Sequence, residues 1–502
     1  DYTFSQSESY VSILTNNTSA QVVSLYGVEQ LQFDDTSISL TTTGSGEFQV
    51  NTYNAGNQTD QAIIALDSGG FVITWTSDGQ DSNKDVYAQI YDAEGNAFGD
   101  EFQVNTYTSN DQDTSSITAL NDGGFVITWQ SKAQDGDHSA SNWSYGVYAQ
   151  RYDVGGDTVG SEFLVNTYIT ADHQTNSDIT ALENGGFVIT WEFRDQTIWA
   201  KIYDAAGDSV GDEFQFNVMV NPTSTVGNGA MESPSIAALD GGDFVVTWHQ
   251  NLPVYTSSRF DYDDVYAQRF NSNDSNLATT FQVNNLHSAF YQYEPDITAL
   301  DSGGFVITWE TDKINSQDVL EGVYAKIYDA AGDSVGDGFR VAVGGFPKTH
   351  TGSNQSSHSI TALESGGFVI TWTSDEDGDG YGVYAQIYDA DGDTVGSEFL
   401  VNTYTTNSQS TPSITALNDD GFVVTWHSLN QDGSDYGIYA QQYDAEGNAL
   451  GEVTLNTFPS LSSAISDAST NEDAAYSYDT SANFSDTDGD TLTYSAKLSD
   501  DS

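Results

Sequence analysis

Clustered carboxylates are the groups in this sequence whose type and spacing could do chemistry. The segment Asp375-Glu-Asp-Gly-Asp-Gly380 matches the opening of the Asp-x-Asp-x-Asp-Gly calcium loop, in which alternate oxygens surround a hard cation and glycine allows a sharp turn. The twelfth position, a glutamate in an EF-hand, is Gln386, and no helical pattern flanks the loop. We therefore predict a Ca²⁺ site at Asp375, Asp377 and Asp379, in a loop between strands.

Other acidic loops repeat this pattern in a weaker form. The further calcium candidates are Asp78, Asp81 and Asp85; Asp135 and Asp137; Asp432 and Asp435; and, near the end of the chain, Glu472, Asp473, Asp486, Asp488 and Asp490. The alternative for each is a solvated acidic turn. That alternative is favoured for the hairpins 92–96, 389–393 and 444–448, where Asp caps the turn and Gly supplies positive φ.

A sevenfold repeat must position these loops. The clearest copy runs from Ser359 to Thr403, and each copy contains one tryptophan in the phrase Phe-Val-Ile/Val-Thr-Trp. These signature tryptophans are Trp75, Trp129, Trp191, Trp248, Trp309, Trp372 and Trp426. A regular period of about 58 residues indicates a solenoid, a propeller or an array of domains.

Each repeat contains four short runs rich in Val, Ile, Phe, Tyr and Thr, which are typical of strands. In the run Phe368 to Trp372, both faces are apolar, so one four-stranded unit cannot cover its own faces. Radial stacking of seven units covers them, whereas immunoglobulin-like domains need about 100 residues each. The sequence predicts an all-β, seven-bladed β-propeller, with the signature tryptophans packed between blades rather than stacking on sugars.

The sequence does not decide which strand closes the ring. The phrase Phe-x-Val-Asn-Thr precedes the first repeat, within Glu47 to Thr52, and a degenerate copy ends the last one, within Glu452 to Thr457. Either copy could complete the last blade.

The composition excludes several classes of partner. Seventy-four acidic residues against 12 basic ones give a formal net charge of −62 at pH 7, so nucleic acid is excluded as a partner. Such self-repulsion is tolerated in high salt or when divalent cations neutralise carboxylates. There is no cysteine, which excludes disulfides and thiolate metal sites, and no apolar run is long enough for a membrane span.

The repeat resembles one found in very large secreted, calcium-dependent surface proteins of bacteria. The residues that carry this resemblance are the phrase Gly382-Val-Tyr-Ala-Gln-Ile-Tyr388, the aspartate after it and the Asp/Gly-rich loop before it. The Asp375 loop is similar to those in the propellers of integrin α-subunits. The resemblance implies calcium binding, type I secretion and an extracellular location, at the cell surface or in a secreted matrix.

The two ends resemble other modules of such proteins. Residues 1–45 read as short strands that end in Tyr26-Gly-Val-Glu-Gln-Leu-Gln-Phe-Asp-Asp35 and Ile38-Ser-Leu40, and this part is similar to a β-rich segment of repeats-in-toxin (RTX) proteins. Residues 461–502 resemble the start of a cadherin-like domain, through Thr470-Asn-Glu-Asp473 and Asp486-Thr-Asp-Gly-Asp490. We expect an N-terminal β segment at 1–45, the propeller at 46–460 and an incomplete cadherin-like β-sandwich at 461–502, within a longer chain.

Catalysis finds little support in the sequence. The histidines, none at metal-ligand spacing, are His138, His173, His249, His287, His350, His358 and His427. His249 and His427 both follow a signature tryptophan, which we interpret as drift of the repeat. Carboxylates are too abundant for an acid–base pair to stand out. Trp143, in the insertion between Lys132 and Tyr145, is a candidate ligand contact, and Trp199 is expected to be structural.

The sequence thus favours a non-enzymatic segment that acts in calcium-dependent adhesion or structural assembly. The alternative is a carbohydrate-binding lectin module, and a polysaccharide lyase or glycosidase ranks third. The expected partners are neighbouring modules of a longer chain, with a homo-oligomer or filament and an extracellular polysaccharide as open alternatives. A ligand site is expected where one repeat departs from the others, and the fourth repeat, with Leu252-Pro-Val-Tyr255, departs most.

Overall fold

The computed structural model describes most of the repeat region. The described residues are 46–79, 83–135, 144–168, 173–194, 197–216, 230–252, 262–270, 280–284, 291–312, 322–341, 355–375 and 379–450, with the backbone of short strands at 30–32, 37–42, 453–455, 460–461 and 484–485. The Asp81, Asp137 and Asp377 candidates, Trp143, and the candidates Glu472, Asp473, Asp486, Asp488 and Asp490 lie outside these ranges.

Seven four-stranded antiparallel sheets form the repeat region, as the repeats predict. Blade 1 is β4(Gln58–Ala65), β5(Phe71–Asp78), β6(Lys84–Tyr91) and β7(Ala97–Gln103); blade 2 is β8(Gln112–Ala119), β9(Phe125–Lys132), β10(Tyr145–Tyr152) and β11(Thr158–Leu164); blade 3 is β12(Gln174–Ala181), β13(Phe187–Phe193), β14(Thr197–Tyr203) and β15(Ser209–Gln215). Blade 4 is β16(Met231–Ala238), β17(Phe244–Leu252), β18(Tyr262–Phe270) and β19(Phe281–Gln282), with a 3-10 turn at Asp240–Gly242.

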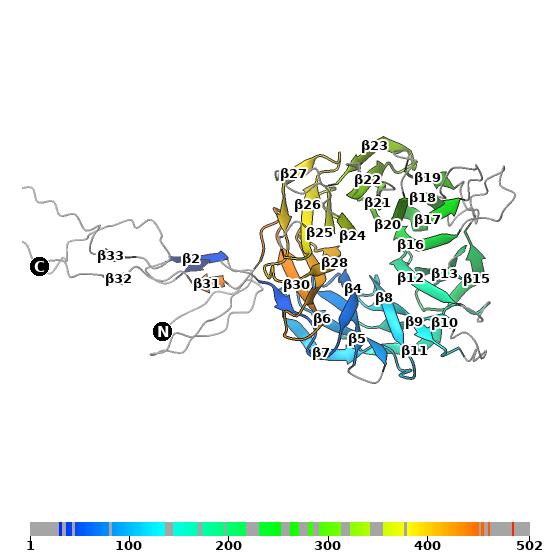
Figure 1. The fold of residues 1–502 in the computed structure, drawn as a ribbon, viewed down its shortest axis with the longest axis horizontal. Helices are drawn as coiled ribbons and strands as arrows, with labels where there is room; N and C mark the ends of the chain where they lie inside the picture. Colours follow the sequence, from blue (N-terminus) through cyan, green and yellow to red (C-terminus); the bar gives the residue numbers. More distant parts are fainter. Residues whose placement is uncertain are drawn as a thin grey trace, which may run out of the picture. The chain divides into compact units, whose positions relative to one another are not determined.

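The remaining blades follow the same order. Blade 5 is β20(Tyr291–Ala299), β21(Phe305–Asp312), β22(Gly322–Tyr328) and β23(Ser334–Arg340); blade 6 is β24(Gln355–Ala362), β25(Phe368–Ser374), β26(Gly382–Tyr388) and β27(Thr394–Leu400); blade 7 is β28(Gln409–Ala416), β29(Phe422–Leu429), β30(Tyr436–Tyr443) and β3(Phe48–Gln49). The first strand of every blade contacts the first strands of both neighbouring blades, and β28 contacts β4, so the seven blades form a closed ring (Figure 1).

The N-terminal copy of the repeated strand closes the ring. Phe48 pairs with Ala440 and Gln49 with Tyr439, and the Val50 N–H donates to the Ile438 carbonyl at 2.8 Å. The C-terminal copy does not join the propeller, because β31(Val453–Leu455) pairs with β2(Ser37–Thr42). The propeller unit therefore spans Gly46–Leu450 rather than 46–460, and residues 1–45 and 451–502 form a second unit.

The second unit contains only short strands in its described backbone. There β1(Gln30–Gln32) pairs with β2, and β32(Ser460–Leu461) pairs with β33(Phe484–Ser485). The expected cadherin-like sandwich lies almost entirely outside the described residues.

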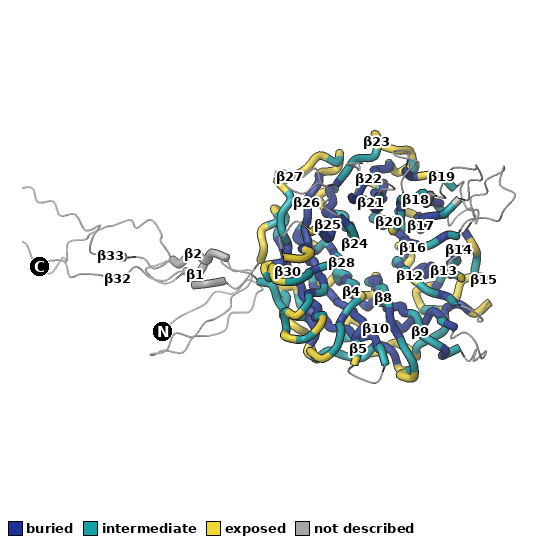
Figure 2. The backbone as a smooth tube through the Cα atoms, in the orientation of Figure 1, coloured by how far each residue is buried: buried dark blue, intermediate teal, exposed yellow. Residues whose placement is uncertain are grey.

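The signature tryptophans pack between blades, which confirms their predicted structural role. All seven are at most 2% exposed. Trp372 of blade 6 lies in one cluster with Val323 and Ile327 of blade 5, and Trp75 of blade 1 lies with Val423 of blade 7. Figure 2 shows second strands such as β25 as mostly buried, whereas fourth strands such as β23 and β27 are largely exposed. The hydrophobic core is therefore divided among the seven interfaces between blades.

The two ends of the ring carry different connections. The connections between first and second strands are uniform, as at 66–70, 120–124 and 182–186. Those between second and third strands vary, from 194–196 in blade 3 to 133–144 in blade 2. The connection to the next blade emerges at this same end, because the strands alternate in direction. We call this end the variable end; it is where function can differ without disturbing the scaffold.

The closure predicts a stability difference between two truncated chains. A chain that begins at Gly46 keeps β3, whereas one that begins at Asn51 leaves blade 7 with three strands and lacks the buried Val50. We expect the second chain to melt several degrees lower, because the edge of β30 and the side of the first blade lose their cover. Differential scanning calorimetry measures this; equal melting temperatures would contradict closure by β3.

Candidate functional site

Every first strand carries a bulge near its start. The register slips after the second residue of the strand in six blades and after the third residue in β20. The residue that follows the slip adopts a positive φ that residues other than glycine rarely adopt. These residues are Asp60, Thr114, Asn176, Ser233, Glu294, Ser357 and Thr411, with φ between 47° and 54°. Since all seven blades share it, the bulge belongs to the scaffold, but the side chain that it presents is free to vary.

Side chains from the preceding blade hold these bulges. In several blades the residue that follows the signature tryptophan bonds to the bulge of the next blade: Thr373 Oγ1 accepts the Thr411 N–H at 3.0 Å, and Thr76 Oγ1 accepts the Thr114 N–H at 3.3 Å. The carboxylates of Glu192 and Glu310 accept the corresponding N–H groups of Ser233 and Ser357. Residues far apart in sequence thus meet in a ring around the propeller axis, close to the variable end.

We define this axial ring by three positions in each blade. They are the residue with positive φ at the bulge, the residue before it, and the residue after the signature tryptophan: Thr59, Asp60, Thr76; Asp113, Thr114, Gln130; Thr175, Asn176, Glu192; Glu232, Ser233, His249; Tyr293, Glu294, Glu310; Ser356, Ser357, Thr373; and Ser410, Thr411, His427. The scaffold requires none of these side chains to titrate. Nevertheless, ionisable residues occupy all three ring positions of blade 5 and two of the three in blade 4.

A cluster of acid–base groups results in blades 4 to 6. It consists of Glu232, His249, Tyr293, Glu294 and Glu310, together with His358 on β24. Glu232 and His249 face each other across β16 and β17, with 3.6 Å between Oε2 and Nε2. Tyr293 is paired with Glu310 across β20 and β21. We call this set the blade 4–6 cluster.

His358 lies buried against the carboxylate of blade 5. Its Nδ1 is 3.7 Å from Glu310 Oε1, and the two side chains are 1% and 2% exposed, respectively. Within the described part of the chain, neither ring nitrogen of His358 has a hydrogen-bond partner. Buried imidazole nitrogens normally form hydrogen bonds. An imidazole without them, next to a carboxylate, is typical of a catalytic or binding residue.

The surroundings of two carboxyl groups in the cluster shift their pKa values in opposite directions. Burial, followed by the negative charge of Glu310 and a hydrogen bond to it, raises the pKa of Glu294, although part of this residue is exposed; His358 and His249 oppose the shift. A hydrogen bond from His249 lowers the pKa of Glu232. Burial, then the charge of Glu310, raises the pKa of Tyr293, so its phenol stays protonated. Two carboxyl groups near the same histidine whose pKa values are shifted in opposite directions suit acid–base chemistry.

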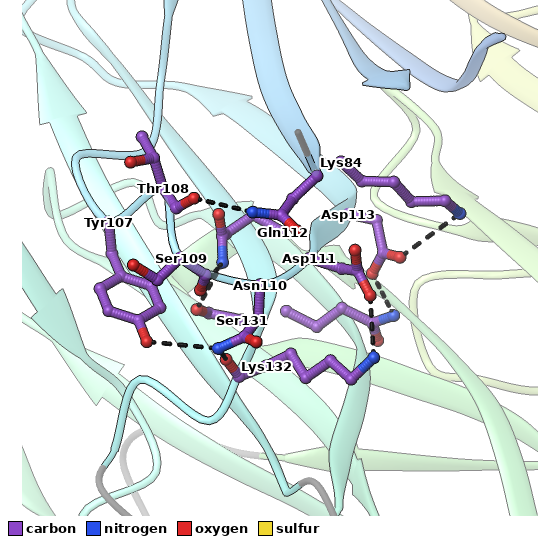
Figure 3. Close-up of polar contacts among 12 residues, drawn as sticks. Lys84, Tyr107, Thr108, Ser109, Asn110, Asp111, Gln112, Asp113, Ser131 and Lys132 are labelled. Carbon is purple, nitrogen blue, oxygen red and sulfur yellow. Dashed lines mark hydrogen bonds and ion pairs between the residues drawn. The ribbon is translucent and has the colours of Figure 1, made fainter. Parts of the chain in front are cut away.

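The corresponding part of blades 1 and 2 is a set of paired charges (Figure 3). Lys132 Nζ lies 2.9 Å from Asp111 Oδ2, and Asp113 accepts a hydrogen bond from Gln130 at 2.6 Å while Lys84 lies 3.6 Å away. Both of these aspartates have a partner, which is the arrangement expected of a structural network.

Asp178 is buried for a structural reason. Its carboxylate accepts hydrogen bonds from Ser116 at 2.8 Å on one neighbouring blade and from the Ile236 N–H at 2.9 Å on the other. Burial raises its pKa to about 6, against the effect of these bonds. Asp178 thus joins three first strands, and this accounts for its position without any chemistry.

The calcium candidates within the described ranges mostly have structural partners. Asp85 accepts a 2.6 Å hydrogen bond from Asn105, whose Oδ1 in turn accepts the Val86 N–H. Asp432 caps a turn through the Ser434 N–H at 2.9 Å, and the Asp435 carbonyl accepts the Asn430 N–H.

The other described candidates do not gather either. Asp78 is paired across the sheet with Lys84, Asp135 accepts a hydrogen bond from Ser144 at 3.3 Å, and Asp375 and Asp379 flank the undescribed 376–378. Among the residues that the structure describes, no three His, Asp or Glu side chains form a group that could hold a metal ion. The hairpin aspartates cap turns as predicted: Asp389 Oδ1, for example, accepts the Asp393 N–H at 2.9 Å.

The sequence interpretation missed the blade 4–6 cluster. It treated His249 as drift of the repeat, whereas the structure places this histidine between two carboxyl groups of opposite pKa shift. The available signal was the residue after each signature tryptophan, which is Thr, Gln, Glu, His, Glu, Thr and His in order. The rest of the phrase is nearly uniform, so this variation indicates that the scaffold does not determine the residue type at this position.

The comparisons with known proteins support the fold. No family model matches the chain, and no curated protein matches it. A polysaccharide lyase of family PL25, an ulvan lyase solved with -[GlcA(1-4)Rha3S]- bound, aligns at 13% identity and a TM-score of 0.50, covering 80% of this chain and 97% of the lyase. The polysaccharide lyase Uly1 aligns at 11% identity and 0.50, covering 83% and 94%. At such identities the likeness shows the propeller fold.

The comparisons correct one expectation from the sequence. The prediction of a non-enzymatic segment acting in adhesion or assembly is wrong: the similar propellers are carbohydrate-active enzymes, and the axial ring carries an acid–base cluster that the prediction did not foresee. Separately, the described residues include no helix long and apolar enough to cross a membrane.

His427 predicts a pH dependence of stability. Burial lowers its pKa to about 4, opposed by Asp60, and its Nε2 lies 2.8 Å from Ser410 Oγ. Above about pH 6.5 the residue is neutral in both states. Below it, the unfolded chain binds the proton first, so stability falls down to about pH 4, by about 3 kcal/mol in total. His427→Gln should flatten this part of the profile in urea titrations; identical profiles would show that His427 ionises freely in the folded protein.

Proposed function

We propose that this chain is a carbohydrate-active enzyme that cleaves a polysaccharide at the blade 4–6 cluster. The observation that carries the proposal is the pair of carboxyl groups beside His249: the pKa of Glu294 is raised and that of Glu232 is lowered. Hydrolysis of a glycosidic bond uses two carboxyl groups whose environments push their pKa values apart, one to act as acid and one as base. The propeller fold shared with polysaccharide-cleaving enzymes supports the same substrate class.

The proposed reaction assigns one role to each carboxyl group. Glu294, protonated, donates its proton to the glycosidic oxygen as the bond from this oxygen to the anomeric carbon breaks. Glu232, ionised, accepts a proton from the water molecule whose oxygen attacks the anomeric carbon, or stabilises the positive charge that develops there. Both residues lie on first strands of adjacent blades, so the rigid scaffold fixes their positions.

The remaining members of the cluster control the proton of Glu294. The charge on Glu310 disfavours ionisation of Glu294. Glu310 is held in place because its carboxylate accepts the Ser357 N–H and lies next to His358. His249 holds Glu232 in its ionised form. These three residues are positioning residues in this proposal, since they act through the two glutamates.

The net charge of the protein favours some polysaccharides over others as the substrate. A net charge of −62 repels densely anionic polymers, so a neutral or weakly charged polysaccharide is the favoured substrate. The sequence resemblance implies an extracellular location. We retain that location, and membership of a longer chain, as parts of the proposal.

A second candidate reaction is β-elimination on a uronate. It is favoured by the protonated phenol of Tyr293 and the unbonded imidazole of His358, which flank the same Glu310 and would serve as acid and base. The products separate the two candidates: elimination leaves an unsaturated sugar that absorbs ultraviolet light, whereas hydrolysis leaves two saturated ends and incorporates oxygen from labelled water.

The role of Glu294 predicts a specific loss of activity. Glu294→Gln cannot donate a proton and should reduce kcat on the cleaved polysaccharide by about 10²- to 10⁴-fold, with little change in the melting temperature. Reducing-end release from neutral and uronate-containing polysaccharides measures this. Asp60→Asn is the matched control, because Asp60 occupies the same left-handed ring position in blade 1. Equal activity of Glu294→Gln and the wild type would refute the proposed acid.

Calcium remains a proposal about stability rather than catalysis. The described residues do not fit a calcium site, so no step of the reaction is assigned to a metal. The Asp375 loop remains the candidate, because clustered aspartates repel each other unless a cation lies between them. If it binds, calcium at 100 times its dissociation constant adds about 2.7 kcal/mol. Melting curves in calcium and in chelator should then differ for the wild type and coincide for Asp375→Asn; coincident wild-type curves would end the calcium proposal.

A further inference from the structure

Blade 3 departs from the repeat at an aromatic position of its third strand. In the other six blades a tyrosine occurs there, and each is buried: Tyr87, Tyr148, Tyr266, Tyr324, Tyr384 and Tyr439. Four of them stack on the signature tryptophan of their own blade, as Tyr87 does on Trp75 with 6.3 Å between ring centroids. In blade 3 the residue is Trp199, which is only partly buried. It stacks on Tyr168 instead, with centroids 6.2 Å apart and ring planes 27° apart.

Tyr168 departs from its own repeat position as well. The phrase Asn-Thr-Tyr also contains Tyr53, Tyr107 and Tyr404, and all three are partly buried. The Tyr53 hydroxyl donates to the Gly79 carbonyl at 2.7 Å, and the Tyr107 hydroxyl accepts a hydrogen bond from Asn110. Tyr168, in contrast, is 78% exposed. Two aromatic residues have therefore changed together, and the result is a stacked pair in which the Tyr168 ring is open to solvent and the Trp199 ring is partly buried.

The backbone beneath this pair is held firmly. Glu213 of blade 3 accepts the Tyr168 N–H at 3.1 Å and the Thr167 hydroxyl at 2.7 Å. Lys201 is 3.3 Å from the same carboxylate, donates to Thr167 Oγ1 at 2.8 Å and to the Val165 carbonyl at 3.0 Å, and is itself buried. Trp199 Nε1 donates to Thr197 Oγ1 at 3.0 Å. A pair of rings mounted in this way loses little conformational entropy when a ligand covers it.

The location relates the pair to the proposed active site. Tyr168 lies in the connection from β11 to β12, and Trp199 lies near the start of β14, so both are at the variable end, where the first strands present the axial ring. The connection between β13 and β14, at 194–196, is short compared with 133–144 in blade 2. Trp199 packs with one part against the core of blade 3, whereas the ring of Tyr168 is left exposed. A large aromatic ring held in this position is costly to leave exposed unless a ligand covers it.

We propose that Tyr168 and Trp199 form a sugar-binding subsite, on which one ring of the polysaccharide stacks. The proposal rests on the proposed function and deepens it, because it makes the substrate a chain long enough to contact blade 3 as well as the cluster of blades 4 to 6. A sugar ring presents an apolar C–H face to an aromatic plane, and its hydroxyl groups donate to the acidic groups abundant in this protein. Lys201, beneath the pair, is buried and already paired with Glu213, so it offers no free charge to a polyanion.

Three variants test the subsite by binding rather than by activity. Tyr168→Ala removes the exposed ring, and Trp199→Tyr restores the residue of the other six blades, so this variant is compatible with the scaffold. Tyr53→Ala is the matched control, because Tyr53 occupies the position of Tyr168 in another blade and is tied to Gly79. Affinity gel electrophoresis of the complete chain, with linear arabinan, xylan, mixed-linkage glucan or ulvan in the gel, measures the dissociation constant for each polysaccharide.

We expect Tyr168→Ala and Trp199→Tyr each to weaken binding about tenfold on a gel that retards the wild type, and Tyr53→Ala to bind as the wild type does. Wild-type migration unaffected by all four polysaccharides, or equal retardation of Tyr168→Ala and the wild type, would overturn the subsite. Weakened binding by the Tyr168 variant in a protein that cleaves none of these polymers supports the subsite and counts against the proposed function. Cleavage lost in Glu294→Gln together with undiminished binding by Tyr168→Ala supports the proposed function and overturns the subsite.

Discussion

Burial of one tryptophan per blade against the preceding blade is the interaction on which the rest of the structure depends. Each four-stranded sheet is apolar on both faces, so no blade is stable until both neighbours cover it. This requirement closes the ring, and it explains why a strand from before the first repeat completes the last blade. It also fixes the bulged starts of the seven first strands around one axis.

Strict repetition of the scaffold makes the exceptions informative. A side chain shared by all seven blades serves the fold, as the signature tryptophans do, and the recurring turn-capping aspartates serve it too. A side chain that changes while its backbone position stays the same serves something else. Glu294 and Asp60 occupy the same left-handed position, yet Glu294 has a raised pKa with Glu310 and two histidines nearby. Tyr168 and Tyr53 differ in the same way, one exposed and the other bonded to its own blade.

The sequence predicts the scaffold well because the scaffold is local and repeated. Four strands per unit, seven blades and buried tryptophans follow from patterns such as Phe368 to Trp372. The closing strand could not be chosen, because residues 47–52 and 452–457 carry the same phrase and only a long-range pairing separates them. The site was hidden for a related reason: Glu232, Glu310 and His358 come together only through contacts within and between blades. In a chain with 74 acidic residues, their type alone singles out none of them.

Glu294 as an acid and Glu232 as a carboxylate, in the same neutral solution, are the centre of the proposed chemistry. The most direct test is a ¹³C NMR titration of the glutamate side-chain carboxyl groups in the wild-type protein, assigned by comparison with Glu294→Gln and Glu232→Gln. We expect one carboxyl that titrates above the ordinary glutamate range and disappears in the first variant, and one that titrates below it and disappears in the second. Two carboxyl groups that both titrate as ordinary glutamates would contradict the assignment of acid and base.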